Sequence, residues 1–172
     1  MEAVQENVEA VDAEATNSRK SPRSVRRVAM DCLARREHSF FELKQKLQNK
    51  LPTTGPDEIQ QELERLRDEN LQSDTRFVES FVRYRKSRGF GYLSIRDNLR
   101  SKFVAEALIE RHLFVDDQEW TLILQALVMR RLSGRSVLQF GSKEHLRMVR
   151  FLRGRGFSQP QIQSSLSSYL HN

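Results

Sequence analysis

The sequence predicts an all-α protein of three tandem three-helix repeats that form an elongated, curved helical array. Three observations lead to this fold class. Apolar residues recur at helical spacing along most of the 172 residues, no alternation typical of a strand extends beyond four residues, and one short motif occurs three times. A motif that recurs along a chain is typical of stacked supersecondary modules, each of which buries its apolar face against its neighbours.

The repeated motif predicts a corner between two helices. Its three copies are RREHSFFELKQKL at 35–47, SRGFGYLSIRDNL at 87–99 and GRGFSQPQIQSSL at 154–166. After an arginine and a short corner, each copy continues into Leu or Ile residues four positions apart, which form one apolar stripe on a helix. Ser39 with Glu42 and Ser158 with Gln161 fit the capping box, in which two side chains satisfy the first backbone N–H groups of a helix. Each copy is therefore expected to end one helix and start the next.

The first repeat is expected over residues 22–72. The preceding residues, 1–21, are polar, acidic and free of aromatic residues, which predicts a disordered acidic tail. An apolar stripe from Val25 to Leu33 predicts the first helix of the repeat, and a second helix is expected from about Phe40 to Asn49. The two prolines of LPTTGP end it, because proline cannot continue a helix. A third helix is expected from about Asp57 to Asn70.

The second repeat is expected over residues 73–115 and the third over residues 116–172. A Ser-Asp pair suited to an N-cap opens the second repeat, and an aromatic helix face with Phe77, Phe81 and Tyr84 follows it. Acidic residues at the start of the third repeat suit a helix N-terminus. A loop is expected at 134–141, and helices at 143–153 and 159–170 complete the chain.

The charge of the chain is positive and unevenly distributed. Residues 1–18 hold five of the 23 acidic residues and none of the 29 lysines and arginines, so the remaining residues carry 29 bases against 18 acids. A positive field of this kind favours a polyanionic partner or an acidic groove. The alternative is a soluble basic protein whose charge only keeps it dispersed.

The sequence argues against several classes of protein. Cys32 is the single cysteine, so no disulfide forms within the chain; a buried thiol and a reducing compartment are expected. No signal peptide is apparent, and the most apolar stretch, 122–129, is too short for a membrane span, which predicts a cytoplasmic protein without membrane contact. Phosphate-binding glycine loops, clustered histidines and a nucleophile–base pair are missing. We therefore expect neither an enzyme nor a metal or cofactor site.

The basic residues form two clusters with almost no acids, which indicates an interaction surface. Arginine predominates, and its guanidinium group forks onto phosphates and carboxylates. Lys143, Arg147 and Arg150 follow helical spacing and predict one stripe. The arginine shared by the motif copies, at 36, 88 and 155, stands at helix ends and could instead bond the last carbonyl groups. We predict that thirteen residues contact a partner: Arg76, Arg83, Arg85, Lys86, Arg88, Arg96, Arg100, Lys102, Lys143, Arg147, Arg150, Arg153 and Arg155.

These motifs resemble the RecX family, which regulates the bacterial RecA recombinase. The resemblance covers about residues 24–170 and is carried, in the same order, by LARREHSFFELKQKL, SDTRFVESFVRYRKSRGFGYLSIRDNL and RFLRGRGFSQPQI. The sequence departs from the family pattern in two places. Tyr92 stands where the family usually has proline, and Gln72-Ser73 replaces a more usual Leu-Asp pair.

The resemblance implies a curved array of three repeats and a regulatory role. Such a protein binds in the groove of the RecA–DNA filament, inhibits its recombinase, ATPase and coprotease activities, and so modulates DNA repair and the SOS response. The thirteen basic residues would contact the filament or its DNA, and a monomer is expected. The residues alone leave open a second interpretation, a stand-alone basic module that binds nucleic acid directly.

Overall fold

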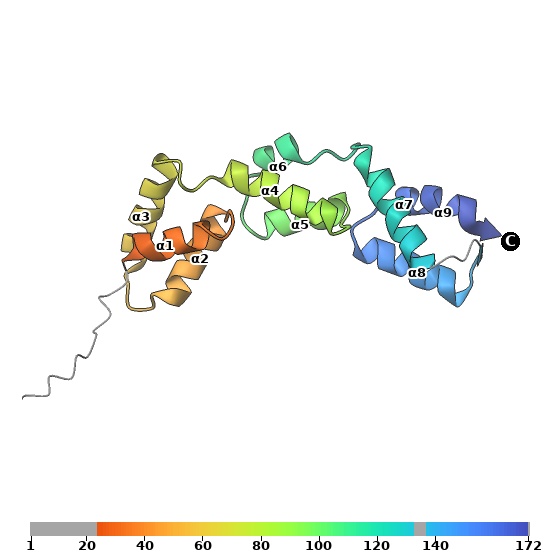
Figure 1. Cartoon of the computed structure of the whole chain (residues 1–172), viewed down its shortest axis with the longest axis horizontal. Helices are drawn as coiled ribbons and strands as arrows, with labels where there is room; N and C mark the ends of the chain where they lie inside the picture. Colours follow the sequence, from red (N-terminus) through yellow and green to blue (C-terminus); the bar gives the residue numbers. More distant parts are fainter. Residues whose placement is uncertain (1–23, 133–136, 172) are drawn as a thin grey trace, which may run out of the picture.

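Nine α-helices in three groups of three make up most of residues 24–132 and 137–171, which this computed structural model describes. The groups stand in a row that is long and bowed (Figure 1). The predicted acidic tail, 1–21, lies outside the described residues. The all-α fold class and the elongated repeat array are therefore confirmed.

Each group of helices is a small bundle. The N-terminal bundle contains α1 (Val25–Leu33), α2 (Phe40–Lys50) and α3 (Pro56–Asp68). The middle bundle contains α4 (Asp74–Ser87), α5 (Tyr92–Arg100) and α6 (Glu106–His112). The C-terminal bundle contains α7 (Glu119–Leu132), α8 (Lys143–Gly154) and α9 (Gln159–Leu166). We propose that these bundles are the predicted repeats, with boundaries at 73 and 116.

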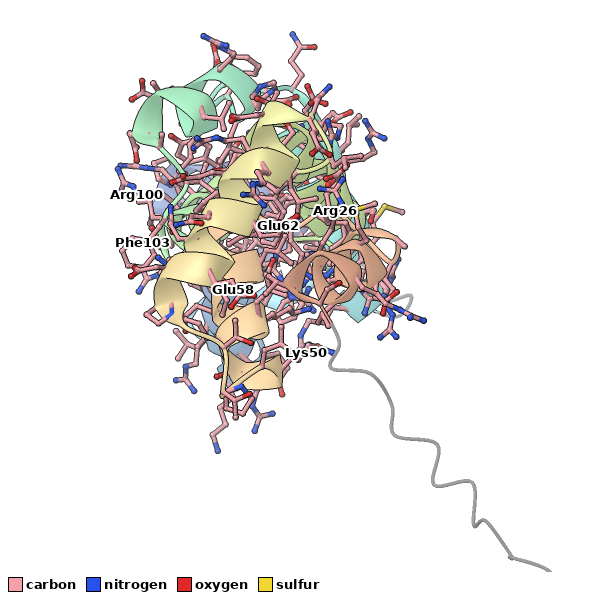
Figure 2. All side chains as sticks on the ribbon, turned by 90° about the vertical axis from the view of Figure 1, so that its left-hand side faces the viewer. Arg26, Lys50, Glu58, Glu62, Arg100 and Phe103 are labelled. Carbon is pink, nitrogen blue, oxygen red and sulfur yellow. The ribbon has the colours of Figure 1, made fainter. Side chains whose placement is uncertain are left out.

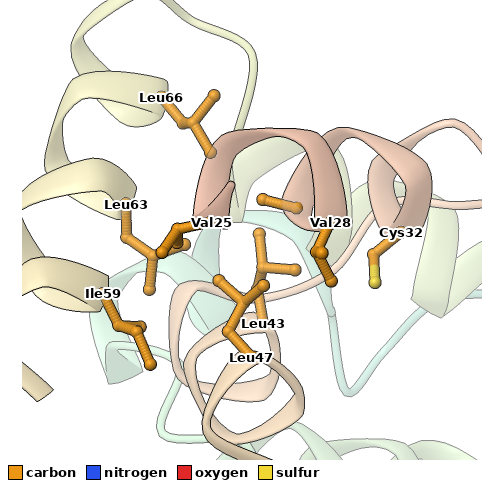
Figure 3. Close-up of a cluster of buried hydrophobic side chains, with 9 residues drawn as sticks. Val25, Val28, Cys32, Leu43, Leu47, Ile59, Leu63 and Leu66 are labelled. Carbon is orange, nitrogen blue, oxygen red and sulfur yellow. The ribbon is translucent and has the colours of Figure 1, made fainter. Parts of the chain in front are cut away.

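The core of the N-terminal bundle is built from the apolar stripes of its three helices (Figure 3). Val28, Leu43 and Leu63 meet there with six further buried residues, among them Cys32, whose thiol is buried as expected. At the surface of the same bundle, Arg26 of α1 forms an ion pair with Glu62 of α3 at 3.1 Å (Figure 2). Close packing of the stripes holds together helices that would be marginal alone.

The C-terminus departs from the predicted helix at 159–170. Helix α9 ends at Leu166, and a 3₁₀ turn (Ser167–Tyr169) and a two-residue strand, β2 (Leu170–His171), follow. Strand β2 pairs in parallel with β1 (Leu138–Gln139). Serines dominate the end of α9, and serine hydroxyls compete with helical hydrogen bonds, as when Ser167 Oγ donates to the Ser164 carbonyl at 2.8 Å. The two strands were not predicted, because a strand of two residues is too short to show an alternation of apolar and polar residues.

The two predicted capping boxes differ in the structure. At Ser158 both halves form, because its hydroxyl accepts from the Gln161 backbone and the Gln161 side chain accepts from the Ser158 backbone. At Ser39 only the hydroxyl half forms, accepting from the Glu42 backbone at 3.1 Å. The prediction of a full box at Ser39 is wrong, because the Glu42 carboxylate turns away to Arg36 and Lys102.

The N-terminal and middle bundles meet at a junction, here called the first joint. Its hydrogen bonds each involve a side chain. The Asp74 carboxylate accepts from the Phe40 backbone at 2.7 Å, and the Gln72 amide donates to the His38 carbonyl at 3.1 Å. Gln72 is one of the departures from the family pattern. It is buried, and its side-chain amide is hydrogen-bonded. Glu37 also forms an ion pair with Arg76 Nε at 2.7 Å.

His38 occupies the position of the phenylalanine found in the other two motif copies. It is buried, and its Nδ1 lies 2.9 Å from the Arg36 carbonyl while its Nε2 lies 2.8 Å from Lys46 Nζ. A neutral ring satisfies both contacts by donating to the carbonyl and accepting from the ammonium group. Burial lowers the pKa of His38, in agreement with a neutral ring.

The middle and C-terminal bundles meet at the second joint, where two motif copies touch directly. The Gly91 N–H donates to the Arg155 carbonyl at 2.8 Å, and the Leu93 N–H donates to the Gly156 carbonyl at 3.1 Å. Only glycine fits at 156, because its φ is +90° and a Cβ atom there would lie 2.3 Å from the Ser94 nitrogen. The motif therefore does more than turn the chain: it joins neighbouring bundles.

Gly156→Ala is expected to lower the free energy of unfolding by roughly 2–4 kcal/mol, because it combines a strained φ with overlap against Ser94. Urea denaturation followed by circular dichroism measures the loss. The matched control is Gly154→Ala, where a new Cβ meets nothing within 4 Å. Equal losses in the two variants would contradict this account of the second joint.

The pH dependence of stability is expected to reflect Glu42. Its burial raises the pKa, but hydrogen bonds from Arg36 and Lys102 outweigh burial and lower the pKa to about 2. The stabilisation is therefore fully present above about pH 4.5, the ordinary value for Glu, and is lost as the pH falls through about 2.

We expect Glu42→Gln to cost about 1–2 kcal/mol at pH 7, after allowance for solvent screening, and the difference from the wild type to shrink below about pH 4.5. Denaturation curves at several pH values measure this. Glu110→Gln, which removes an exposed acid with no ion pair to a described residue, serves as the control. A constant difference across the pH range would rule out the ion pairs as its cause.

Candidate partner interface

Five of the thirteen predicted contact residues form ion pairs within the chain. They connect helices or bundles, so part of their role is structural, although Arg96 and Arg100 share the carboxylate of Glu106 and Lys102 shares that of Glu42 with Arg36. Glu42 pairs with Lys102 at 3.1 Å across the first joint, and Glu106 pairs with Arg100 at 2.6 Å between α5 and α6. The five residues are Arg76, Lys86, Arg96, Arg100 and Lys102.

Lys86 connects the end of α4 to the start of α7. Its ammonium group contacts the carboxylates of Asp117 and Glu119, the latter at 2.7 Å, and lies 4.6 Å from the Trp120 ring centroid. Burial lowers the pKa of Lys86, but the two carboxylates outweigh it and leave the pKa raised. Trp120 itself packs into the core of the middle bundle, so this contact anchors the C-terminal bundle.

Arg85 and Arg155 both stack on the ring of Phe90. Their guanidinium carbons lie 3.4 Å and 4.7 Å from the ring centroid, and Arg155 also donates to the Arg88 carbonyl at 2.8 Å. The last contact fits the prediction that the motif arginine bonds a terminal carbonyl, here across the second joint. Burial lowers the pKa of Arg85, and the charge of Arg155 acts in the same direction.

The remaining predicted cations face solvent. Among the described residues, none forms an ion pair with Arg83, Arg88, Lys143, Arg147 or Arg150, and all five are exposed. Arg153 is exposed as well and donates to Gln159 at 2.8 Å. Lys143, Arg147 and Arg150 lie on one exposed face of α8, opposite its buried residues, and are called the α8 stripe below. An anionic partner can reach Arg83, Arg88 and the α8 stripe without breaking an ion pair between described residues.

A cleft of about 590 Å³ lies beside the second joint, between the end of α4 and α7. Four cationic side chains line it, and none of its lining residues is acidic. Its opposite wall includes Leu122, which is 66% exposed. The cations of the cleft are Lys86, Arg88, Arg130 and Arg155. The two basic clusters of the sequence therefore meet here, because Arg155 of the second cluster contacts Arg88 of the first.

A second cavity, which the sequence did not single out, lies at the first joint. It measures about 600 Å³, and Phe77, Phe81 and Tyr84 of α4 line one side of it. The signal was present as an aromatic helix face, but core packing is the usual fate of such residues. Tyr84 is an exception to core packing, since 59% of its surface is exposed. The cavity is also lined by Arg36, Glu37, Ser80 and Lys102.

Phe40, Phe41 and Tyr92 stand near the corners of the repeated motif, and all three are half-buried in the structure. Phe41 stacks against Phe103 across the first joint, with ring centroids 4.1 Å apart. Phe40 packs against the N-terminal core, and Tyr92 packs against the middle core. All three rings therefore contribute to packing within the protein.

The arrangement suits binding of anions by exposed guanidinium groups. Within residues 24–132 and 137–171, no three His, Cys, Asp or Glu side chains gather as metal ligands. No helix in that part of the chain has the length and apolar character to cross a membrane.

Comparisons with known proteins agree on one family. The family model described as "RecX, second three-helix domain" matches residues 73–113. "Regulatory protein RecX" of Pseudomonas entomophila (strain L48) is 37% identical over 148 residues, which are 86% of this chain and 92% of the relative. "Regulatory protein RecX" of Pseudomonas tolaasii is 40% identical over 144 residues, which are 84% of this chain and 90% of the relative.

The fold has a counterpart among solved structures. The crystal structure of RecX from Lactobacillus salivarius superposes with a TM-score of 0.66 at 20% sequence identity, and the match covers 83% of this chain and 92% of that one. At this identity the likeness concerns the fold alone. The identity to the curated relatives, over nearly their whole length, establishes the relationship: this chain belongs to the RecX family of regulatory proteins.

Proposed function

We propose that this protein binds in the groove of the RecA–DNA filament and inhibits the recombinase, ATPase and coprotease activities of RecA. In this role it modulates DNA repair and the SOS response, acting as a cytoplasmic monomer without chemistry of its own. Membership of a family of regulatory proteins supports the proposal.

The observation that carries the proposal is the set of exposed cations held on an elongated body. These cations lie on α8 and at the end of α4, so they are spread over two of the three bundles that stand in a row (Figure 1) rather than around one pocket. An extended array of this kind suits a long groove, whose acidic walls and phosphates lie at several points along it.

We assign the partner contacts to the cations that form no ion pair with any of the residues described by the structure. These are Arg83 and Arg88 near the end of α4, the α8 stripe and Arg153. The ion-paired residues Arg76, Lys86, Arg96, Arg100 and Lys102, and the stacked Arg85 and Arg155, hold the bundles in place and add to the positive field. Inhibition then follows from differential binding, in which the protein stabilises an inactive filament state.

Reversing charge on the α8 stripe is expected to weaken inhibition. The variant Arg147→Glu/Arg150→Glu should need roughly tenfold more protein for half-inhibition of RecA ATPase on single-stranded DNA, because two contacts become repulsive. The matched control, Arg27→Glu/Arg35→Glu, makes the same change of charge on exposed residues of the N-terminal bundle. If both variants inhibit like the wild type, or lose inhibition equally, the α8 stripe is not the contact.

The alternative of a stand-alone nucleic-acid-binding module is separated by the affinity of the protein for DNA in the absence of RecA. We expect weak binding to DNA alone that falls steeply with salt, beside tight binding to RecA filaments. Fluorescence anisotropy with labelled duplex, with and without RecA, measures both. Equally tight binding in the absence of RecA would favour the alternative.

A further inference from the structure

Helix α7 has an apolar outer face in addition to its buried inner face. Leu122 is 66% exposed and Met129 is 63% exposed. With Ala126 between them, they follow helical spacing and stand on one side of α7. No residue from 121 to 129 is charged, whereas the outer face of a helix in a globular protein is ordinarily polar. A contiguous apolar face of this kind indicates a contact that buries it.

Part of this face forms one wall of the cleft at the second joint. Four aliphatic side chains line that wall: Leu122, Ile123, Ala126 and Leu127. The cleft measures about 590 Å³, which is room for several side chains of a ligand rather than one. Because the wall is part of a cleft, a segment of polypeptide fits it better than the flat surface of a bilayer does.

The opposite wall of the cleft is positively charged. Arg88 is exposed and Arg155 is half-buried, and neither forms an ion pair with a described residue. Lys86 does not add to this charge, because Asp117 and Glu119 already bind it. Among the described residues, no acidic side chain lines the cleft. A ligand that fills the cleft therefore gains affinity if it carries an anionic group.

The lining of the cleft disfavours stacking of a nucleic-acid base. Phe90 is the aromatic residue of the lining, and two guanidinium groups already stack on its ring. The guanidinium carbon of Arg85 lies 3.4 Å from the ring centroid, and that of Arg155 lies 4.7 Å from it. Bases of single strands bind by stacking on free aromatic rings, which aliphatic side chains do not replace. A DNA strand would use the arginines and leave the aliphatic wall unfilled.

We propose that the cleft at the second joint is a docking site for an acidic, aliphatic segment of the partner protein. Leucine, isoleucine or valine side chains of the segment pack against α7, and an aspartate or glutamate carboxylate binds Arg88 in the positive field of Arg155. Both walls of the cleft are then used. The proposal rests on the proposed function for the identity of the partner, RecA, and adds that the protein component of the filament, rather than its DNA, occupies this cleft.

The aliphatic wall is tested by Leu122→Ser, which shortens an exposed side chain without changing the charge. It should weaken binding to RecA filaments on single-stranded DNA roughly tenfold, because an apolar contact is lost, and should leave binding to DNA alone unchanged. Fluorescence anisotropy of the labelled protein measures both affinities, and circular dichroism checks the fold. Met30→Ser is the matched control, since Met30 is an exposed apolar residue of the N-terminal bundle, and it should bind like the wild type.

The possible results separate the cleft from the proposed function. If Leu122→Ser binds filaments like the wild type, or loses affinity for DNA alone to the same extent, the proposal is overturned. If the wild type itself does not bind RecA filaments, the proposed function fails, and RecA as the occupant of the cleft fails with it.

The occupant is identified by crosslinking from an introduced cysteine. Ser87 lines the cleft and Ser101 does not, yet both are exposed serines at helix ends whose hydroxyl groups donate to a backbone carbonyl at 2.8 Å. Ser87→Cys and the control Ser101→Cys each take a thiol-reactive diazirine, because the native thiol of Cys32 is buried.

In RecA filaments on single-stranded DNA, the label at position 87 should attach to RecA peptides that contain both acidic and aliphatic residues. Mass spectrometry should find these products well above the level obtained from position 101. Attachment mainly to DNA, to the acidic residues 1–18 of this chain or to a second copy of the chain overturns the proposal.

Discussion

The structure depends on the close approach of two peptide backbones at the second joint. Gly91 and Gly156 allow this approach, because a side chain on either would collide with the other corner. Hydrogen bonds between the two main chains then fix both the distance and the rotation between the middle and C-terminal bundles. That rotation determines which charges of the two bundles face the same direction. Three-helix bundles of this size are marginal alone, so the joints also matter for stability.

The positive charge of the chain serves two purposes. Some of the basic residues form ion pairs at the joints. Lys86 and Lys102 are examples, and their ion pairs connect neighbouring bundles. The other part, typified by the α8 stripe, remains exposed. A count of basic residues does not separate the two parts, because they alternate along the chain. Acids distant in sequence make the difference: Asp117 and Glu119 compensate Lys86, and Glu42 compensates Lys102.

The sequence predicted the fold class and helix order well, because apolar periodicity and capping residues are local signals. Helix starts at Ser39, Ser73 and Ser158 are examples, and the family resemblance was confirmed. What escaped prediction depends on distant contacts. The Glu42 carboxylate left its expected cap for Arg36, six residues before it, and for Lys102 of the middle bundle. The two short strands needed the C-terminus to return to residue 138. Likewise, Tyr84 has the same spacing as core residues, and only the packing of the bundles shows that it stays exposed.

The two joints differ in the kind of contact that holds them, and this has a mechanical consequence. At the second joint, hydrogen bonds connect the two main chains directly, which allows little movement of one bundle relative to the other. At the first joint every bridging hydrogen bond passes through a side chain, such as those of Asp74 and Gln72, and side chains can swing. The molecule is thus a stiff rod of two bundles with a softer hinge before it. Changes in the shape of the molecule are therefore expected at the first joint, as movements of the N-terminal bundle relative to the other two.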